Sequence, residues 1–188
     1  LLYDSSSAFL HVALAQDYLL LGNLELAQQQ LDKALRIDAN HIPALELKVV
    51  MLRGRRDVAQ TRECVKRLSE LAPNDPRYLR EMLAIALSQN DFEQADRLYR
   101  RVVEIEGETD QLIKQVLTVY LMSGQHRRAI PLLEELHRRD STDAAIVFSL
   151  GTTHLQSGDS TKGIEFMRHA NRMEPTQPRY WIGVGALA

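Results

Sequence analysis

A 34-residue period runs through this chain, and it constrains the fold more than any other feature of the sequence. Gly22 and Gly158 are 136 residues apart, which is four times 34. When the sequence is aligned with itself at this spacing, five blocks match without a gap: 8–41, 42–75, 76–109, 110–143 and 144–177. Self-similarity at a period of about 20–50 residues indicates one small structural unit that is used repeatedly.

Each block carries the residue types of two helices joined by a short turn. Position 15 of the successive blocks is Gly22, Arg56, Asn90, Gly124 and Gly158. Position 16 is Asn23, Asp57, Asp91, Gln125 and Asp159. Glycine and asparagine tolerate the left-handed backbone that ends a helix, and the polar residue that follows can cap the next helix. The blocks therefore predict helical hairpins.

Two further positions predict how the helices of a hairpin pack. Position 20 is always small, as in Ala27, Thr61, Ala95, Ala129 and Gly163. Position 24 is always large and apolar, as in Leu31, Val65, Tyr99, Leu133 and Met167. A small residue lets two helices approach closely, and the large residue four positions later lies on the same helical face.

These hairpins predict an all-α fold. A hairpin cannot bury its apolar face alone, so neighbouring hairpins stack into a solenoid. We expect residues 1–188 to form a single solenoid. Residues 178–188 continue the period as the first helix of a truncated sixth repeat or cap. Because this last segment is mostly apolar, we expect the chain to be a fragment of a longer protein.

The repeats resemble those of the tetratricopeptide repeat family. That family places Leu, Gly or Ala, Tyr, Ala, a large apolar residue, Ala and Pro at positions 7, 8, 11, 20, 24, 27 and 32. The first block matches with Leu14, Ala15, Tyr18, Ala27, Leu31 and Ala34. The fifth matches with Leu150, Gly151, Gly163, Met167, Ala170 and Pro175. The resemblance implies a right-handed α-solenoid that binds proteins without catalysing a reaction.

The second block departs most from the family pattern. Lys48, Val49, Thr61 and Leu68 replace the family residues, and Gly54 lies two positions before the expected turn. The sequence therefore leaves the geometry of this turn open and predicts that the second block is the least stable of the five.

Composition and motifs give no indication of an enzyme or a nucleic-acid-binding protein. The formal charge is −2, whereas proteins that bind nucleic acid usually present a strongly basic surface. Single Cys64 cannot form an internal disulfide, and the six histidines show no zinc-binding spacing. No phosphate-binding glycine loop occurs. We expect no catalytic residues, no metal and no cofactor.

The resemblance implies a binding groove lined by the first helix of each repeat. In this family, positions 2, 5, 9 and 12 typically face the groove. Our candidate ligand-binding residues are Phe9, Val12, Gln16, Glu46, Arg53, Arg77, Arg80, Lys114, Thr118, Phe148 and Thr152. Apolar residues lie at the two ends of this set and cations in its middle, so we expect a peptide or protein segment with an acidic centre. Arg77, Arg80 and Phe148 are the expected anchors, since arginine and aromatic residues dominate interfaces.

The family also contains domains that clamp the C-terminal carboxylate of chaperones. In the two windows where that clamp could lie, its polar residues are replaced. The positions hold Val12, Gln16, Leu47, Arg77 and Glu81 in one window, and Glu46, Val50, Glu81, Gln111 and Gln115 in the other. This role is disfavoured.

Three functions remain open. The first is an adaptor that holds a protein segment in its groove. Block one resembles bacterial proteins that assist pilus, secretion or polysaccharide-export assembly, which favours a periplasmic or outer-membrane-associated location over the cytoplasm. The second is a regulatory or substrate-recruiting arm of a larger enzyme. The third is self-association through Trp181–Ala188.

Overall fold

The computed structural model describes residues 2–180, and side chains from Ser7 to Tyr180. The predictions for Trp181–Ala188 lie outside the described residues. Within the described part the chain is helical, with no strand. It divides into two compact units, which extend from Leu1 to Gly107 and from Glu108 to Ala188. The all-α solenoid fold predicted from the sequence is confirmed.

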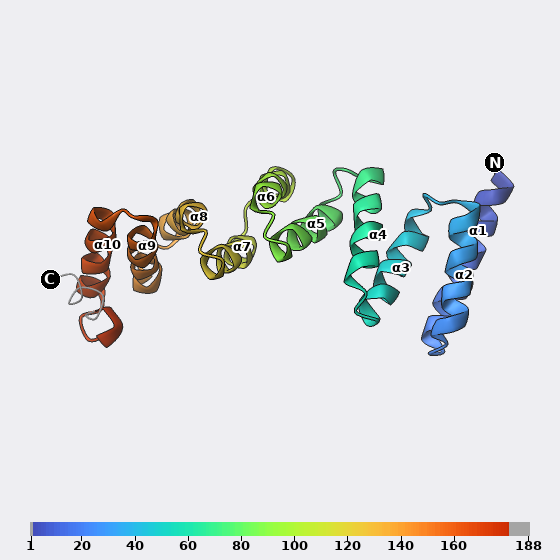
Figure 1. Cartoon of the computed structure of the whole chain (residues 1–188), viewed down its shortest axis with the longest axis horizontal. Helices are drawn as coiled ribbons and strands as arrows, with labels where there is room; N and C mark the ends of the chain where they lie inside the picture. Colours follow the sequence, from blue (N-terminus) through green and yellow to red (C-terminus); the bar gives the residue numbers. More distant parts are fainter. Residues whose placement is uncertain (1, 181–188) are drawn as a thin grey trace. The chain divides into compact units, whose positions relative to one another are not determined.

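Unit 1 contains three helical hairpins, one for each of the first three blocks (Figure 1). Its helices are α1 (Leu2–Leu20), α2 (Leu24–Ile37), α3 (Ile42–Gly54), α4 (Val58–Leu71), α5 (Pro76–Ser88) and α6 (Phe92–Glu106). Helix α1 begins six residues before the first block, whereas the later first helices begin close to the block boundary.

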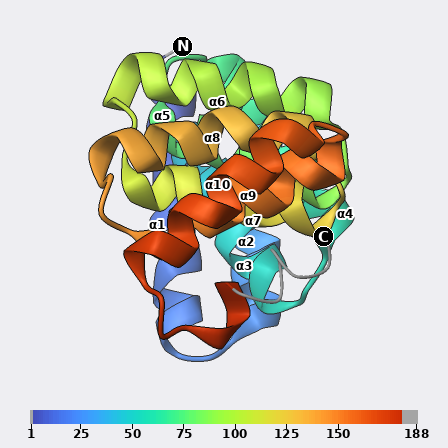
Figure 2. The ribbon, with the colours of Figure 1, turned by 90° about the vertical axis from the view of Figure 1, so that its left-hand side faces the viewer.

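Unit 2 contains the hairpins of the fourth and fifth blocks. Its helices are α7 (Asp110–Met122), α8 (His126–Arg139), α9 (Ala144–Ser157) and α10 (Ser160–Met173). Helices α9 and α10 lie side by side in both ribbon views, and Figure 2 shows them along most of their length. That these hairpins and those of unit 1 form one continuous solenoid stays a prediction.

The turn inside every block has the same backbone geometry. All five residues at position 15 have positive φ angles: 74° at Gly22, 57° at Arg56, 58° at Asn90, 68° at Gly124 and 97° at Gly158. Gly54 is instead the last residue of α3. The second block therefore keeps the register of the others, and a residue with a Cβ atom adopts the strained left-handed conformation there.

Position 16 caps the second helix in four of the five blocks. The side chains of Asn23, Asp57, Asp91 and Asp159 each accept a hydrogen bond from a backbone N–H in the first turn. Gln125, which precedes α8, makes no such side-chain bond. The cap predicted from the sequence is present where the side chain is short.

Small residues mark the closest approach of paired helices. Ala27, Ala95 and Ala129 have no exposed surface. Two glycines of unit 2 lie very close to the opposite helix: a Cβ atom added to Gly163 would lie 2.6 Å from Leu155 Cγ, and one added to Gly151 would lie 2.9 Å from the Gly163 carbonyl oxygen. These positions admit nothing larger than glycine without movement of α9 against α10.

Apolar clusters between successive hairpins form the core. Val12, Ala15, Ala27 and Leu31 of the first block pack with residues of α3 that include Met51. Tyr78 of α5 packs with α3 and α4 of the second block. Tyr180 is fully buried against Ala144, Val147 and Ala170 of the fifth. Within unit 1 the first and second hairpins are therefore each covered by the one that follows, as stacking of repeats requires.

Candidate functional site

The candidate binding surface is the exposed side of the first helices, treated separately in each unit. In unit 1 these are α1, α3 and α5. Helices α3 and α5 lie next to each other, since Arg77 Nη1 of α5 is 3.0 Å from Glu46 Oε1 of α3, and Arg53 of α3 pairs with Glu81 of α5. We call this surface the unit 1 inner face.

The cations predicted on the inner face are already paired with carboxylates of the same chain. Arg77 contacts both Asp75 and Glu46, and Arg80 pairs with Glu106 at the end of α6. The two arginine side chains are 48–67% exposed and their carboxylate partners 22–36%, so these pairs lie at the surface. Exposed ion pairs of this kind orient the arginine side chains but add little to the stability of the fold. The sequence predicted a row of cations at the middle of the groove. In unit 1 the structure balances the charges of these arginines with carboxylates of the same chain.

Tyr78 joins this network although the sequence analysis did not predict it. Its hydroxyl donates a hydrogen bond of 2.6 Å to Glu46, while its ring lies under the Arg77 guanidinium at 5.1 Å. Burial, followed by the hydrogen bond to the Glu46 carboxylate, raises the pKa of Tyr78 to about 12. The hydrogen bond from Arg77 lowers the pKa of Asp75. The phenol is thus kept protonated as a donor, and the Asp75 carboxylate is kept charged.

The apolar part of the unit 1 inner face is open to solvent. Phe9 of α1 is 63% exposed and Val50 of α3 is 60% exposed, while Ala84 and Gln16 are also exposed. Val12 does not belong to this surface. It is 3% exposed and packs with Ala15 and Leu31, because position 5 of the first helix turns into the core there. A ligand therefore cannot reach Val12.

The predicted residues of unit 2 have different surroundings. Lys114 and Thr118 of α7 are exposed, and no ion pair holds Lys114 among the described residues. The Thr118 hydroxyl donates to the Lys114 carbonyl oxygen. Thr152 of α9 is half-buried and donates to Ser149 O. Phe148 is half-buried, with its ring 4.9 Å from that of Tyr180. Phe148 is therefore at least partly a packing residue.

An arginine–carboxylate cluster in unit 2 was also not predicted from the sequence. Arg139 at the end of α8 contacts Glu108, Asp110 and Glu135 at 2.6–2.8 Å. Hydrogen bonds from Arg138 and Arg139 lower the pKa of Glu135 to about 2. The cluster links the start of α7 to the end of α8. Each of its charged side chains has an ion-pair partner within the cluster.

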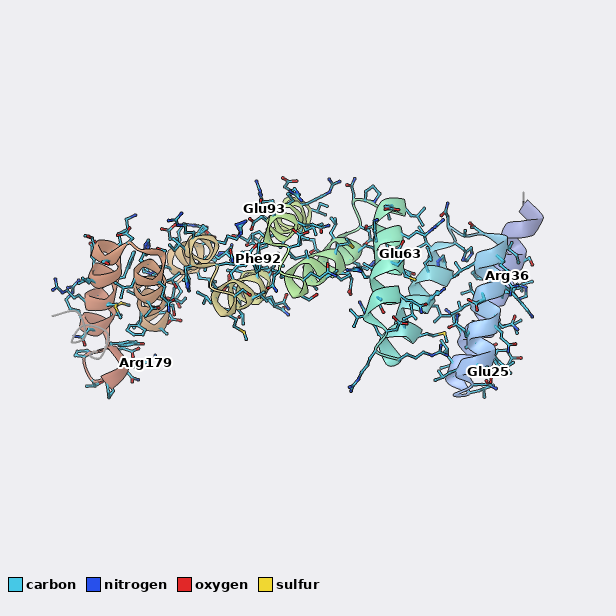
Figure 3. All side chains as sticks on the ribbon, in the orientation of Figure 1. Glu25, Arg36, Glu63, Phe92, Glu93 and Arg179 are labelled. Atoms are coloured by element: carbon cyan, nitrogen blue, oxygen red, sulfur yellow. The ribbon has the colours of Figure 1, made fainter. Side chains whose placement is uncertain are left out.

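A second type of link joins neighbouring repeats on the other side of unit 1. Arg67 donates two hydrogen bonds to Asn40, and Arg101 donates one to Asn74. The two residues of each pair are 27 positions apart. Arg at position 26 of one block and Asn at position 33 of the preceding block therefore recur in the sequence, and this recurrence could have predicted the contact. Other charged side chains of the second helices point outwards, among them Glu25, Arg36 and Glu63, which are labelled in Figure 3.

Unit 2 also has a hollow of about 280 Å³ beside its second helices. Glu134 of α8 and five residues of α10 line it: Lys162, Glu165, Phe166, His169 and Arg172. Its charges are mixed and balanced. Within the described residues no three metal-binding side chains gather, and no helix has the length and apolar character of a membrane span.

The comparisons agree with this geometry. Sequence profiles described as tetratricopeptide repeat match residues 10–41 and residues 120–187. No curated protein matches the chain. Among solved structures, YrrB, described as "a TPR protein with an unusual peptide-binding site", is 15% identical with a TM-score of 0.61, and the match covers 91% of this chain and 88% of YrrB.

Two bacterial structures are similar over comparable lengths. MamA from Desulfovibrio magneticus is 18% identical with a TM-score of 0.58, and the match covers 92% of this chain and 97% of that one. PilF from Pseudomonas aeruginosa is 15% identical with a TM-score of 0.50, and the match covers 96% of this chain and 82% of that one. At these identities the similarity concerns the fold.

Proposed function

The chain belongs to the tetratricopeptide repeat family, whose repeats are scaffolds for protein–protein interaction, and on this premise we propose that it holds a peptide or protein segment on its inner faces without catalysing a reaction. The proposal rests on the exposure of Phe9 on α1 and Val50 on α3, together with the ion pairs that join α3 and α5. Large apolar side chains in solvent next to oriented charges are typical of a binding surface.

The ion pairs of the inner face favour a partner segment with acidic residues between apolar ones. Arg53, Arg77 and Arg80 form ion pairs with Glu81, Glu46 and Glu106. An acidic partner residue would compete with these glutamates for the same guanidinium groups. Apolar contacts to Phe9 and Val50 then supply the affinity, and the arginines select the partner's charge.

The peptide-binding description of YrrB supports the same kind of ligand, although the similarity to YrrB concerns the fold. Assembly at the bacterial envelope is the cellular setting that we propose from the sequence resemblance. A role as the recruiting arm of a larger enzyme is the alternative, and it uses the same surface.

A random peptide library displayed on phage tests this function. We expect the chain to select peptides that combine apolar residues with Asp or Glu, and Phe9→Ala or Arg77→Glu with Arg80→Glu to weaken the best synthetic peptide at least tenfold. Arg62→Glu on α4 is the matched control, because it reverses an exposed charge away from the first helices. Failure to select any peptide, or equal loss in the control, would contradict the proposal.

A further inference from the structure

The outer side of α6 carries a hollow of about 600 Å³, which we call the α6 hollow. Six residues of α6 line it: Gln94, Arg97, Leu98, Arg100, Arg101 and Glu104. All but Arg100 occupy positions 19, 22, 23, 26 and 29 of the third block. Spacings of three and four residues place these side chains on one stripe of the helix.

The α6 hollow has an equivalent in unit 2. The hollow beside α10 is lined by the same five positions of the fifth block, and by Glu134 at position 25 of α8 in the preceding block. In α6 the stripe also faces the preceding repeat, because Arg101 at position 26 donates a hydrogen bond to Asn74 in the linker between α4 and α5. The α6 hollow therefore lies on the α4 side of α6, within unit 1.

Positive charge distinguishes the α6 hollow from the same place in other repeats. Three arginines and one glutamate give its lining a formal charge of +2. In the α10 hollow, Lys162 and Arg172 are balanced by Glu134 and Glu165. The same five positions of α4 hold one cation and two carboxylates, being Gln60, Glu63, Cys64, Arg67 and Glu70. The charge is thus specific to this hollow and is not a general property of the repeat.

The arginines of the α6 hollow have no carboxylate partner. Within the part of the chain that the structure describes, none of Arg97, Arg100 and Arg101 forms an ion pair. Arg100 bonds to the Asp96 carbonyl oxygen, and Arg101 to the neutral amide of Asn74. The arginines of the unit 1 inner face, in contrast, each have a carboxylate partner. An anion that reaches the α6 hollow therefore meets no carboxylate already bound to these guanidinium groups.

The exposure of the three arginines indicates the kind of ligand. All three are exposed, so the contact of one of them with a small anion would contribute little in solvent. A ligand that contacts several guanidinium groups at once gains from each contact. Arg97 and Arg101 are about 6 Å apart along the helix axis, which matches two carboxylates at residues i and i+4 of a partner helix. Leu98, half-buried beside them, offers an apolar contact to the same partner.

We propose that the α6 hollow is a docking site for an acidic segment of a partner protein. Guanidinium groups donate paired hydrogen bonds to carboxylates, and complementary charge increases the rate of association and selects the partner. The site lies on a second helix, whereas the unit 1 inner face is built from first helices. It is therefore a separate binding site from the one proposed above.

Fluorescence anisotropy with a labelled 12-residue peptide of Glu-Glu-Leu-Ala repeats tests the site, because this peptide places Glu at i and i+4. We expect the chain to bind it at least tenfold more tightly than the matching Gln-Gln-Leu-Ala peptide. Arg97→Glu with Arg101→Glu should raise the dissociation constant at least tenfold. Lys33→Glu with Arg36→Glu is the matched control, since it reverses two exposed cations of α2. Circular dichroism checks that each variant is folded.

The same assay separates this site from the inner face. Arg77→Glu with Arg80→Glu should leave the affinity for the acidic peptide within about twofold. Equal affinity for the Glu and Gln peptides, equal loss in the α2 control, or loss only in the inner-face variant would overturn the proposal. Loss only in the inner-face variant would at the same time support the function proposed above. A single-stranded DNA 12-mer that binds as tightly as the acidic peptide would show a general affinity for polyanions and would also overturn it.

Discussion

At the residue scale, Arg56 shows how strongly the period constrains the backbone. The sequence has Arg where the first, fourth and fifth blocks have Gly, yet Arg56 has a φ of 57°. The hydrogen bonds from Arg56 N to Arg53 O and from Asp57 N to Leu52 O close the turn as in the other blocks. The required conformation is thus set by the hairpin and imposed on a residue that disfavours it.

Replacing Arg56 with glycine should stabilise the chain. A non-glycine residue in the left-handed region costs roughly 1–2 kcal/mol, and the extra entropy of glycine in the unfolded chain offsets part of that gain. We expect a net increase of about 0.5–1 kcal/mol in the free energy of unfolding, measured by urea denaturation. Arg55→Gly is the control, because Arg55 has a φ of −86° and gains nothing from glycine. An equal gain in both variants would count against this account.

Residue identities predict the turns and caps well and the ionic contacts poorly. Position 15 and position 16 act within a few residues of chain, so their residue types indicate their geometry directly. Glu46, one of the two partners of Arg77, is 31 residues away and the partner of Arg53 is 28 residues away, and the choice among nearby carboxylates depends on side-chain rotamers. The burial of Val12 likewise depends on how α1 is rotated against α3. The residue pattern of one repeat does not show how one helix is rotated against the helix of the next repeat.

At the element scale, the contacts of Glu135 at the end of α8 make the stability of the chain depend on pH. Two arginine hydrogen bonds lower the pKa of Glu135 from its ordinary 4.5 to about 2 in the folded chain. A carboxyl group with a depressed folded pKa contributes stability that is present above pH 4.5 and is lost as the pH falls towards 2. Glu135 is half-buried but its partner Arg138 is exposed, so the size of this contribution depends on ionic strength.

Glu135→Gln should therefore flatten the fall of thermal stability between pH 4.5 and 2. The measurement is the unfolding midpoint at low salt across this range, followed by circular dichroism. Glu134→Gln serves as the control, since Glu134 is a neighbouring exposed carboxylate without an ion pair in the described part of the chain. If the two variants follow the same curve, Glu135 is not the group responsible.

At the scale of the whole molecule, stability in stacked repeats is close to a sum over each repeat and its neighbours. We expect the second repeat to be the least stable of the five, because several of its residues fit their positions poorly. It contains the strained Arg56, and Thr61 stands at the helix-crossing position, where its hydroxyl bonds to the Asp57 carbonyl. Lys48 is half-buried where the family has a leucine. In the fifth repeat the equivalent residues are Gly158, Gly163 and Leu150, all compatible with their positions.

This difference predicts an uneven pattern of local opening. In native-state hydrogen exchange, the amides of α3 and α4 should exchange before those of α9 and α10, because opening the second repeat disrupts the smaller sum of packing and backbone terms. Arg56→Gly with Thr61→Ala should slow exchange in α3 and α4 and leave α9 and α10 unchanged. Since each repeat contacts only its neighbours, this gain stays local. Protection of α3 and α4 that equals or exceeds that of α9 and α10 would show that stacking between repeats outweighs the defects within one.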